Sequence, residues 1–324
     1  MSTNTRSEFR DLLDRDEVAL APVVHNALAA QVTNKIGGFD LLGISGYGGS
    51  LSALGLPDAG YISMTEMVEL SRAIAETADA PVYADADTGF GNAVTARRTA
   101  RQFIQYTDVA GLFLEDQVSP KRCGHVSGKR VLPMEEAVGK VRAVCDVRDE
   151  LDPNFVVIAR TDARGAAGGS LADAIERGNA YHEAGADIIF VEGPTTEAEV
   201  ERIGQEVDAP LKYNQTGVSP FLDSETLAEY GFSISSVTTT RVAIVALYDH
   251  LKALRDDGID AEATFREDFL DHAVGDLHKF SDMGDVVDLE RAYLPEEEQS
   301  KYGTSIGHDG DAYRTEKVTN EGSE

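Results

Sequence analysis

The chain has few cysteines, few lysines and no long apolar run. Its 324 residues include two cysteines and no Cys-x-x-Cys spacing, which argues against a disulfide framework and a zinc site. No stretch approaches the roughly 20 apolar residues that a membrane-spanning helix needs. Residues 1–6 lack the apolar stretch of a secretory signal. We therefore expect a cytoplasmic protein with no membrane partner.

Basic residues are scarce as a class. Nine lysines and twenty arginines stand against 57 acidic residues, and the net charge is −28. Nucleic-acid binding is not expected, because neutralising phosphates takes clustered Lys and Arg. The acidic excess is spread along the chain and is not confined to its end. This pattern predicts a surface that stays hydrated in concentrated salt, as in halophilic proteins.

Short apolar runs alternate with helix-like segments through most of the chain. Eight runs predict strands, at 18–24, 41–45, 81–85, 110–115, 155–160, 188–192, 210–214 and 232–237. Seven segments have helical patterns, at 65–78, 93–107, 134–150, 171–184, 197–206, 224–230 and 242–255. Strands that are apolar on both faces and alternate with helices predict a parallel sheet. Eight such units predict an α/β fold of the (β/α)8, TIM-type barrel class. An open doubly wound sheet is the alternative, but no G-x-G-x-x-G follows the first strand.

The strand–helix pattern weakens after the eighth unit. We predict a catalytic barrel domain over 1–258 and a C-terminal helical extension over 259–294. Residues 295–324 are acidic and polar, which predicts an extended or disordered tail. The length fits one barrel, which typically takes about 250 residues before extensions.

Polar residues stand at the ends of five consecutive predicted strands. They are Asp85, Glu115, Arg160, Glu192 and Asn214. The carboxyl ends of the strands of a barrel converge on one face, where barrel enzymes place their chemistry. One such residue could simply mark where the chain meets water. Five in register predict an active-site face.

Four carboxylates near this face could hold a divalent cation. Asp85 and Asp87 are two residues apart, so one face of the strand end can carry both. With Glu115 and Asp58 they form an oxygen-rich set without His or Cys, which suits Mg²⁺, or Mn²⁺, better than zinc. Helix caps and solvated turns are the alternative reading of these carboxylates.

A cysteine lies among cationic residues in the segment 121–125. Cys123 follows Lys121 and precedes His125, and neighbouring cations lower a thiol's pKa from about 8.5. We therefore expect a thiol that exchanges its proton near neutral pH. Cys145 has helical neighbours and is expected in the core.

Three other segments offer groups that could bind carboxylates. The glycine-rich residues 45–50 let backbone amides approach an anion, with an ordinary flexible loop as the alternative. Arg160 can hold a carboxylate with two parallel hydrogen bonds, or pair with Glu192 or Asp162 as a strut. Thr238 begins three consecutive threonines after the eighth strand, which serve either the site or strand propensity.

Together these residues resemble the isocitrate lyase / phosphoenolpyruvate mutase superfamily over residues 10–255. The resemblance rests on Ser45-Gly46 and Asn214 and on the segments 55–58, 85–91, 115–117, 121–125, 160–162 and 190–193. The Lys-Arg-Cys-Gly-His segment is similar to the carbon–carbon lyase branch, because the phosphonate-forming mutases lack that cysteine.

The resemblance implies a barrel whose terminal helix swaps onto a neighbour, in a homotetramer built from two dimers. It implies Mg²⁺ at Asp85, with metal-bound waters held by Asp58, Asp87 and Glu115. The substrate-binding residues it implies are Ser45, Gly46, Gly124, Arg160, Glu192, Asn214 and Thr238. The catalytic residues it implies are Cys123, as general acid, together with His125, Lys121 and Tyr47.

The implied reaction is retro-aldol, Claisen-type cleavage of a 2-hydroxy tricarboxylate. Isocitrate, giving succinate and glyoxylate, is favoured by the likeness of 128–133, Tyr213-Asn214 and Thr238 to isocitrate lyases. The chain's length and residues 214–220 are more similar to 2-methylisocitrate lyases, which give succinate and pyruvate. A lyase acting on 2-alkylmalates or oxaloacetate is a further alternative, and a non-catalytic barrel that binds a dicarboxylate is the competing class. Both lyase types usually carry a tyrosine, proposed as base, where this chain has Gly43, which makes Tyr47 a candidate substitute.

Overall fold

The computed structural model describes residues 2–304, 306–307 and 310–313. The chain divides into two compact units, Met1–Ala243 and Ile244–Glu324. The residues predicted to carry the chemistry all fall in the first unit.

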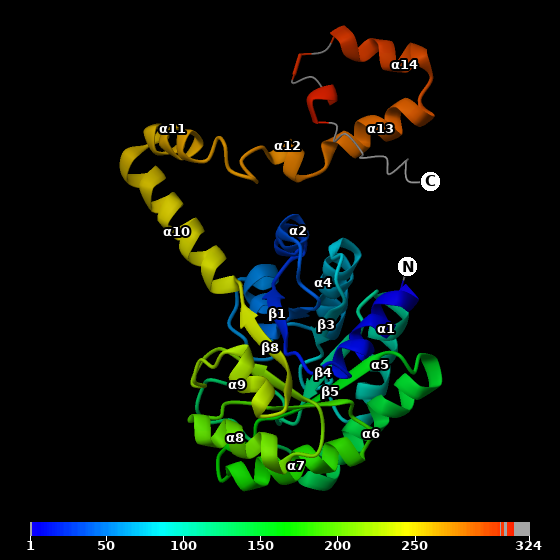
Figure 1. Ribbon diagram of the computed structural model, residues 1–324, viewed down its shortest axis with the longest axis vertical. Coiled ribbons are helices and arrows are strands. Elements are labelled where there is room, and N and C mark those ends of the chain that lie inside the picture. Colours follow the sequence, from blue (N-terminus) through cyan, green and yellow to red (C-terminus); the bar gives the residue numbers. More distant parts are fainter. Residues whose placement is uncertain (1, 305, 308–309, 314–324) are drawn as a thin grey trace. The chain divides into compact units, whose positions relative to one another are not determined.

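The first unit is a closed barrel of eight parallel strands (Figure 1). Each strand pairs with the next along the chain, and β8 pairs with β1 to close the ring. The strands are β1 (Ala19–Val24), β2 (Leu42–Ile44), β3 (Val82–Asp85), β4 (Gly111–Glu115), β5 (Val156–Thr161), β6 (Ile188–Val191), β7 (Leu211–Asn214) and β8 (Phe232–Thr238). All eight lie where the apolar runs predicted them, and the (β/α)8 fold class is confirmed.

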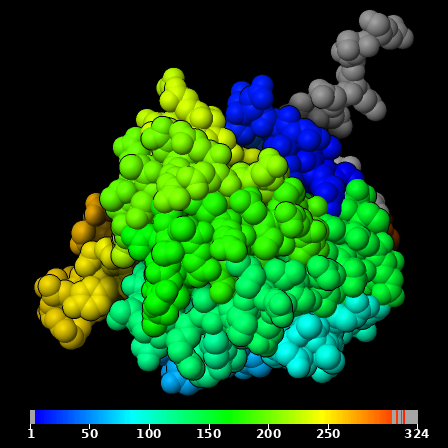
Figure 2. All heavy atoms as spheres, turned by 90° about the horizontal axis from the view of Figure 1, so that it is seen from below, coloured from blue at the N-terminus to red at the C-terminus, as the bar shows by residue number. Residues whose placement is uncertain are grey.

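Seven helices follow the first seven strands and cover the outside of the ring. They are α2 (Ala27–Ile36), α4 (Met64–Thr77), α5 (Ala93–Tyr106), α6 (Met134–Leu151), α7 (Leu171–Glu183), α8 (Glu197–Glu206) and α9 (Ser224–Glu229). Figure 2 shows the part of the chain that includes α5 to α8, coloured cyan to green, as one continuous outer surface. The prediction missed α2 and the N-terminal α1 (Ser2–Leu13). Helix α4 begins just before the predicted range 65–78 and is capped by Ser63, whose side chain and Glu66 form a capping box.

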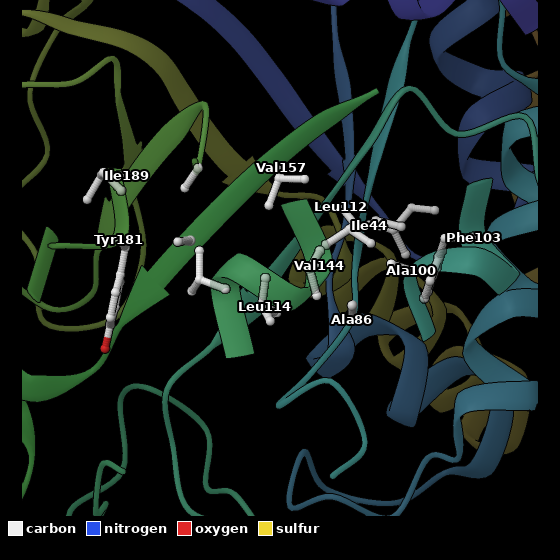
Figure 3. Close-up of a cluster of buried hydrophobic side chains, with 14 of the residues drawn as sticks. Ile44, Ala86, Ala100, Phe103, Leu112, Leu114, Val144, Val157, Tyr181 and Ile189 are labelled. Carbon is white, nitrogen blue, oxygen red and sulfur yellow. The ribbon is translucent and has the colours of Figure 1, made fainter. Parts of the chain in front are cut away.

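Apolar side chains fill two separate layers. The outer layer lies between strands and helices (Figure 3), and includes Ile44, Leu112, Leu114, Val157 and Ile189 from the strands and Phe103 and Val144 from the helices. The inner layer fills the barrel lumen with Tyr83, Phe113, Ile158, Phe190 and Ile234. Helix α1 contributes Phe9 to this inner layer, where its ring stacks on Tyr83 at 6.2 Å between centroids. The strands are thus buried on both faces, as expected for parallel strands with helices on one side.

A glycine on β2 leaves room for a tyrosine on β3. Gly43 and Tyr83 are register partners on these neighbouring strands. A Cβ atom added at Gly43 would lie 2.4 Å from the hydroxyl oxygen of Tyr83. The Tyr83 hydroxyl in turn shares a hydrogen bond of 2.8 Å with Ser236 Oγ on β8. Tyr83 therefore takes up lumen space that any side chain at position 43 would need.

The glycine-rich segment after β2 is helical and not a flexible loop. Residues Gly46–Gly49 form α3, and Ser50–Leu54 continue it as the π-helical turn η1. Ser45 caps α3 by accepting a hydrogen bond from the amide of Gly48. Three glycines did not prevent a helix here, because packing holds the turn: Gly46, Gly48 and Gly49 are all buried.

Helix α10 (Thr240–Asp257) begins in the first unit and continues in the second. The second unit also contains α11 (Ile259–Asp268), α12 (Leu277–Phe280), α13 (Met283–Tyr293) and α14 (Glu296–Ser300). The predicted extended tail over 295–324 is wrong where it is described, since α14, η3 (Lys301–Thr304) and η4 (Gly310–Tyr313) are helical there. Residues 305, 308–309 and 314–324 lie outside the described part. Among the described helices, none is long and apolar enough to cross a membrane.

We predict that Gly43→Ala destabilises the barrel. The added methyl group meets the Tyr83 ring, and overpacking of this kind typically costs about 1–3 kcal/mol. Gly139→Ala in α6 is the matched control, because nothing lies within 4 Å of its added Cβ. Ala in a helix interior is favoured over Gly by about 0.8–1 kcal/mol, so the control should be slightly more stable. Urea denaturation of the three proteins measures both changes, and equal stability of Gly43→Ala and the wild type would contradict the packing argument.

Candidate active site

A buried ammonium group lies among four carboxylates at the carboxyl end of the barrel. Lys121 Nζ is 2.9 Å from Asp58 Oδ1 and 3.4 Å from Asp87 Oδ2. Asp85 and Glu115, which end β3 and β4, also interact electrostatically with it. Lys121, Asp58, Asp85, Asp87 and Glu115 are each at most 9% exposed. We call these five residues the carboxylate cluster.

Local backbone geometry brings the cluster together. Asp85 Oδ2 accepts a hydrogen bond of 2.6 Å from the Gly46 amide, and its Oδ1 accepts one of 2.7 Å from the Asp87 amide. Asp87 itself has φ +52°, an uncommon conformation outside glycine that Asp tolerates better than most. A Cβ at Gly46 would come within 2.8 Å of Asp85 Oδ2 and 3.2 Å of Lys121 Nζ. Only glycine at position 46 lets the backbone approach this closely.

Burial and mutual charge shift the ionisation of the cluster. Burial raises the pKa of Asp85, and Lys121 opposes that shift. Burial also raises the pKa of Glu115 well above its usual range, against the attraction of Lys121 and Arg160. For Lys121, burial lowers the pKa, but the four carboxylates outweigh it and the net pKa is raised well above its ordinary value. Lys121 therefore stays charged and is the cation that offsets this acidic pocket.

The cluster has buried carboxylate oxygen atoms that lack a hydrogen bond and fit a hard divalent cation. Asp58 Oδ1, Asp87 Oδ2 and both carboxylate oxygens of Glu115 are buried without a hydrogen-bond partner. Buried polar atoms of this kind call for an explanation, and an ion or its waters supplies one. Within the described residues, no three His, Cys, Asp or Glu side chains converge tightly enough to ligate one ion directly. That arrangement fits Mg²⁺, which often takes one or two carboxylates and keeps several waters.

A second group of charges surrounds Arg160 at the end of β5. We call Arg160, Asp162 and Glu192 the Arg160 group. Asp162 accepts from Arg160 Nε at 2.9 Å and from its Nη2 at 3.0 Å. Arg160 also lies 3.4 Å from Glu115 Oε2 and 3.4 Å from Glu192 Oε2. The strut alternative is thus the arrangement seen here, with Asp162 as the bidentate partner. Arg160 Nη1 faces Glu192, whose two carboxylate oxygens have no hydrogen-bond partner.

The segment 117–130 between β4 and α6, which we call the cysteine loop, is fixed at several points. Gln117 donates from Nε2 to the Arg122 carbonyl at 2.8 Å and accepts from the Arg122 amide at 3.1 Å. Lys129 donates to the Gly124 carbonyl and lies 3.8 Å from Asp162. A Cβ at Gly124 would lie 2.3 Å from Arg160 Nη2. The backbone of the loop at Gly124 therefore packs directly against Arg160.

A pocket of about 610 Å³ opens beside the cysteine loop. Its walls come from the loop on one side, including Lys121 and Cys123, and from Tyr47 and Asp58 on the other. Tyr47 is 44% exposed, so it stands in the pocket wall and not at the buried cluster. Substrate-sized molecules can therefore reach the cysteine and the edge of the carboxylate cluster together.

The expectation of an acidic thiol is wrong in this structure. Burial raises the pKa of Cys123, and the carboxylates of Asp58 and Glu192 add to that rise. The His125 backbone and Arg160 oppose it without reversing it. The Lys121 side chain turns toward the carboxylate cluster, and Arg122 donates a hydrogen bond to the Ser127 carbonyl. These two cations are therefore engaged elsewhere and do not lower the pKa of the Cys123 thiol. Cys123 is thus a thiol that keeps its proton, which suits a donor. Cys145 is buried, as predicted, and burial raises its pKa to about 12.

Two of the predicted residues meet on the far side of the Arg160 group. His125 Nε2 lies 3.8 Å from Glu192 Oε1 and 3.5 Å from Thr216 Oγ1. Thr216 donates to Asn214 Oδ1 at 2.9 Å, which joins Asn214 on β7 to the cysteine loop. The histidine ring also fills the space over Gly217, where a Cβ would come within 1.9 Å of Nδ1.

Two predicted residues remain apart from these contacts. The Ser45 hydroxyl caps α3 by accepting a hydrogen bond from the Gly48 amide. Thr238 accepts a hydrogen bond of 3.4 Å from the Thr240 amide. In the part of the chain that the structure describes, no hydrogen bond links either side chain to the carboxylate cluster. Their roles in substrate binding stay predictions.

Sequence reasoning gave no site role to Gln117, Lys129 and Lys212, and it treated Asp162 only as an alternative partner of Arg160. Asp162 is fully buried and is the main partner of Arg160. Lys212 is buried in the lumen on β7. The sequence did hold a signal for Lys212. Side chains two residues apart in a strand face the same side, so Lys212 faces the same side of β7 as the predicted site residue Asn214.

A closed barrel with buried carboxylates, a charged lysine and a proton-bearing thiol at its carboxyl end defines an enzyme of the barrel class. Residues 9–255 match the family described as phosphoenolpyruvate phosphomutase. The chain belongs to the phosphoenolpyruvate mutase / isocitrate lyase superfamily, as the motifs indicated. This is an enzyme family of lyases and mutases.

Several named relatives align along most of this chain. The 2,3-dimethylmalate lyase of Eubacterium barkeri is 41% identical over 89% of this chain and 96% of its own length. The 2-methylisocitrate lyase of Halalkalibacterium halodurans is 38% identical over 77% and 82%. The isocitrate lyase of Haloferax volcanii is 32% identical over 89% and 87%. A solved phosphonopyruvate hydrolase in complex with oxalate and Mg²⁺ superimposes with a TM-score of 0.78 at 29% identity, covering 90% of this chain and 99% of that one.

We predict slow alkylation of Cys123 at neutral pH. Because burial raises its pKa, the reactive thiolate is scarcer at pH 7 than in free cysteine, and the rate should rise as pH passes above 9. Iodoacetamide kinetics followed by mass spectrometry measure this, in a Cys145→Ala background so that one thiol reports. A rate that already levels off below pH 7 would restore the acidic-thiol expectation.

Proposed function

We propose that this protein is a Mg²⁺-dependent carbon–carbon lyase that cleaves a 2-hydroxy acid bearing at least two carboxylates. One observation carries the proposal: the Cys123 thiol, whose pKa burial raises, lies on a loop anchored between two charged groups. Lys121 ties that loop to the carboxylate cluster, and Gly124 packs on Arg160. An acid placed this way can protonate a carbanion formed between the two groups.

Different parts of the site would bind different parts of the substrate. The carboxylate cluster supports the hydroxyl end of the substrate, with the Gly46 backbone close to Asp85. Arg160 and Asn214 would hold the far carboxylate, and Glu192, 3.8 Å from His125 Nε2, would help to position the cysteine loop at His125. Cys123 Sγ–H then delivers its proton to the carbon that leaves with the electron pair of the broken bond. Hydrogen bonds of Gln117 and Lys129 within the loop would hold the thiol in place and limit the access of water.

The carboxylate oxygens of Asp58, Asp87 and Glu115 that lack a hydrogen bond, with Asp85, would hold Mg²⁺, directly or through its waters. When bound, the ion supplies a Lewis acid for the oxygen that becomes a carbonyl. Manganese is the alternative ion, since it accepts the same oxygen ligands.

Isocitrate is the first substrate we propose, with succinate and glyoxylate as products. The alternatives are 2-methylisocitrate and 2,3-dimethylmalate, and the second is favoured by the 41% identity to a 2,3-dimethylmalate lyase. Isocitrate and 2-methylisocitrate differ by one methyl group, which a pocket distinguishes by only about 1–3 kcal/mol. 2,3-Dimethylmalate has a methyl group where 2-methylisocitrate has a carboxymethyl group, so it lacks one carboxylate. Substrate preference must therefore be measured.

The decisive assay compares release of glyoxylate or pyruvate from isocitrate, 2-methylisocitrate and 2,3-dimethylmalate, with release of oxalate from oxaloacetate measured alongside. We expect cleavage of one of the first three in the presence of Mg²⁺ and high KCl, the latter because the net charge of −28 favours a salt-adapted protein. Chelation by EDTA should abolish turnover and added Mg²⁺ should restore it. Turnover of none of the first three compounds would refute the proposal.

We predict that Cys123→Ser separates catalysis from binding. A serine hydroxyl is a far weaker acid than a thiol, so kcat should fall by about 10²–10⁴-fold. Binding of succinate, measured by calorimetry, should change little because the residue size is kept. Cys145→Ser is the control, since Cys145 lies in the core and should leave kcat unchanged. A Cys123→Ser enzyme with near wild-type kcat would remove the thiol from the mechanism and favour a different acid.

We also propose a homotetramer in the cytoplasm. Helices of the second unit carry apolar side chains that its own residues do not cover: Ile259 is 78% exposed, Leu270 76% and Leu277 73%. Helix α11 has no buried residue at all. Exposed apolar surface of this extent marks an interface. Light scattering coupled to size exclusion should give four times the 34.8 kDa chain mass, and a monomer mass would contradict this.

A further inference from the structure

A buried carboxylate outside the pocket connects helix α7 to the Arg160 group. Asp116, directly after β4, is 4% exposed. Its Oδ2 accepts a hydrogen bond of 2.7 Å from the Tyr181 hydroxyl and one of 3.4 Å from Arg177 Nη1. Arg177 Nη1 also donates to the Tyr181 hydroxyl oxygen at 3.2 Å. We call Asp116, Arg177 and Tyr181 the Asp116 group.

The other oxygen of Asp116 holds the backbone beside Arg160. Asp116 Oδ1 accepts a hydrogen bond of 3.0 Å from the amide of Asp162. The side chain of Asp162 in turn accepts the two hydrogen bonds that orient the Arg160 guanidinium. The Asp116 amide also donates to the Arg160 carbonyl at 3.2 Å. The orientation of Arg160 therefore depends on where Asp116 lies, with Asp162 as the link between them.

Helix α7 gives this carboxylate two polar partners from one face. Arg177 and Tyr181 are four residues apart on the helix, where side chains lie side by side. Both are buried, and the Tyr181 ring packs in the outer apolar layer (Figure 3). A phenylalanine ring would fill that layer equally well, so packing alone does not call for the hydroxyl. The hydroxyl serves the buried carboxylate, which would be costly without such partners.

The Asp116 group lies outside the pocket, whose walls come from other residues. Burial raises the pKa of Asp116, as does the charge of Asp162, while hydrogen bonds from the Asp162 amide and from Tyr181 oppose the rise. These hydrogen bonds favour the charged form of Asp116, which is the stronger acceptor for the Asp162 amide. Loss of the Tyr181 hydroxyl would therefore also weaken the bond between Asp116 and that amide.

We propose that Tyr181 is a positioning residue, which acts through Asp116 to fix the direction of the Arg160 guanidinium. This rests on the lyase function proposed above, in which Arg160 holds the far carboxylate of the substrate. Asp162 takes Nε and Nη2 of Arg160, so a shift of Asp162 turns the whole guanidinium plane. Hydrogen bonds weaken steeply as their angle departs from linearity, and a turned guanidinium binds the carboxylate less well.

The first test compares the kinetics of Tyr181→Phe and the wild type with the substrate that the wild type cleaves best. KM should rise about tenfold, the worth of one hydrogen bond to a charged group. The value of kcat should stay within about threefold, as for a change that acts on binding alone. Tyr230→Phe is the matched control, because it removes a tyrosine hydrogen bond of 3.0 Å to the exposed Glu197, and it should behave as the wild type. An unchanged KM in Tyr181→Phe, or a loss confined to kcat, would overturn the proposal.

Arg177→Gln is the second variant, in case Tyr181→Phe does not fold. It removes the longer contact to Asp116 and leaves the Tyr181 hydroxyl in place. KM should rise by a smaller factor, about threefold, because the longer contact is the weaker of the two. A folded Arg177→Gln enzyme with the KM of the wild type would contradict the proposal.

A double-mutant cycle distinguishes positioning from a general loss of packing. Arg160→Lys removes the planar guanidinium that Asp162 orients, so it should itself raise KM. Tyr181→Phe added to Arg160→Lys should then raise KM by less than about twofold, because the two changes affect one interaction. An equal effect of Tyr181→Phe in both backgrounds would leave Tyr181 a packing residue and overturn the proposal.

Hydrogen exchange of the Asp162 amide tests the link without any substrate. In Tyr181→Phe this amide should exchange about tenfold faster, because its acceptor is held less firmly. The Ile158 amide within β5 is the reference for unfolding of the barrel and should not change. Mass spectrometry with fragmentation that resolves single amides measures both, with Tyr230→Phe as the control.

The exchange result separates this proposal from the lyase function. Faster exchange at Asp162 alone supports the positioning of the Arg160 group even if the substrate assay fails, in which case only the lyase assignment is refuted. Unchanged exchange at Asp162, or equal acceleration at Ile158, overturns the Tyr181 proposal whatever the enzyme cleaves.

Discussion

The contact of Lys121 with Asp58 and Asp87 is the interaction on which the site depends. Without that ammonium group, Asp58 and Asp87 would lose the cation that they contact, and unpaired buried charge is strongly unfavourable. Lys121 is also two residues from Cys123 in the same loop. The residue that balances the acidic pocket therefore also fixes where the thiol stands, and a shift of one must move the other.

At the neighbouring strand ends, the Arg160 group likewise pairs a buried cation with buried carboxylates. Arg160 holds Asp162 and approaches Glu115 and Glu192, so it connects both halves of the site. Gly124 rests against this guanidinium, and Lys129 holds the Gly124 carbonyl from the other side. The cysteine loop is thus held at its start by the carboxylate cluster and in its middle by the Arg160 group. Few parts of this loop are free to move independently of the charges.

The barrel was predictable from sequence because its signal is regular. Eight apolar runs between helical segments leave few folds open, and strand ends in register located the site face. The helical turn after β2 was not predictable from local pattern, since three glycines disfavour a helix and only burial stabilises it. The same limit applied to Cys123: sequence neighbours suggested a lowered pKa, but Lys121 and Arg122 point elsewhere and burial decides. Lys212 was missed because a lysine within a strand carries no motif, and its aromatic surroundings come from other strands.

The fit between Gly43 and Tyr83 links the evolutionary histories of two neighbouring strands. A lineage that places a bulky residue on β2 at this level must first shrink the residue on β3, and the reverse order holds for a chain like this one. Each intermediate carries either a clash or a hole in the lumen, and both are unfavourable. In this chain, a large residue at position 43 is therefore compatible with the barrel only if the residue at position 83 becomes smaller.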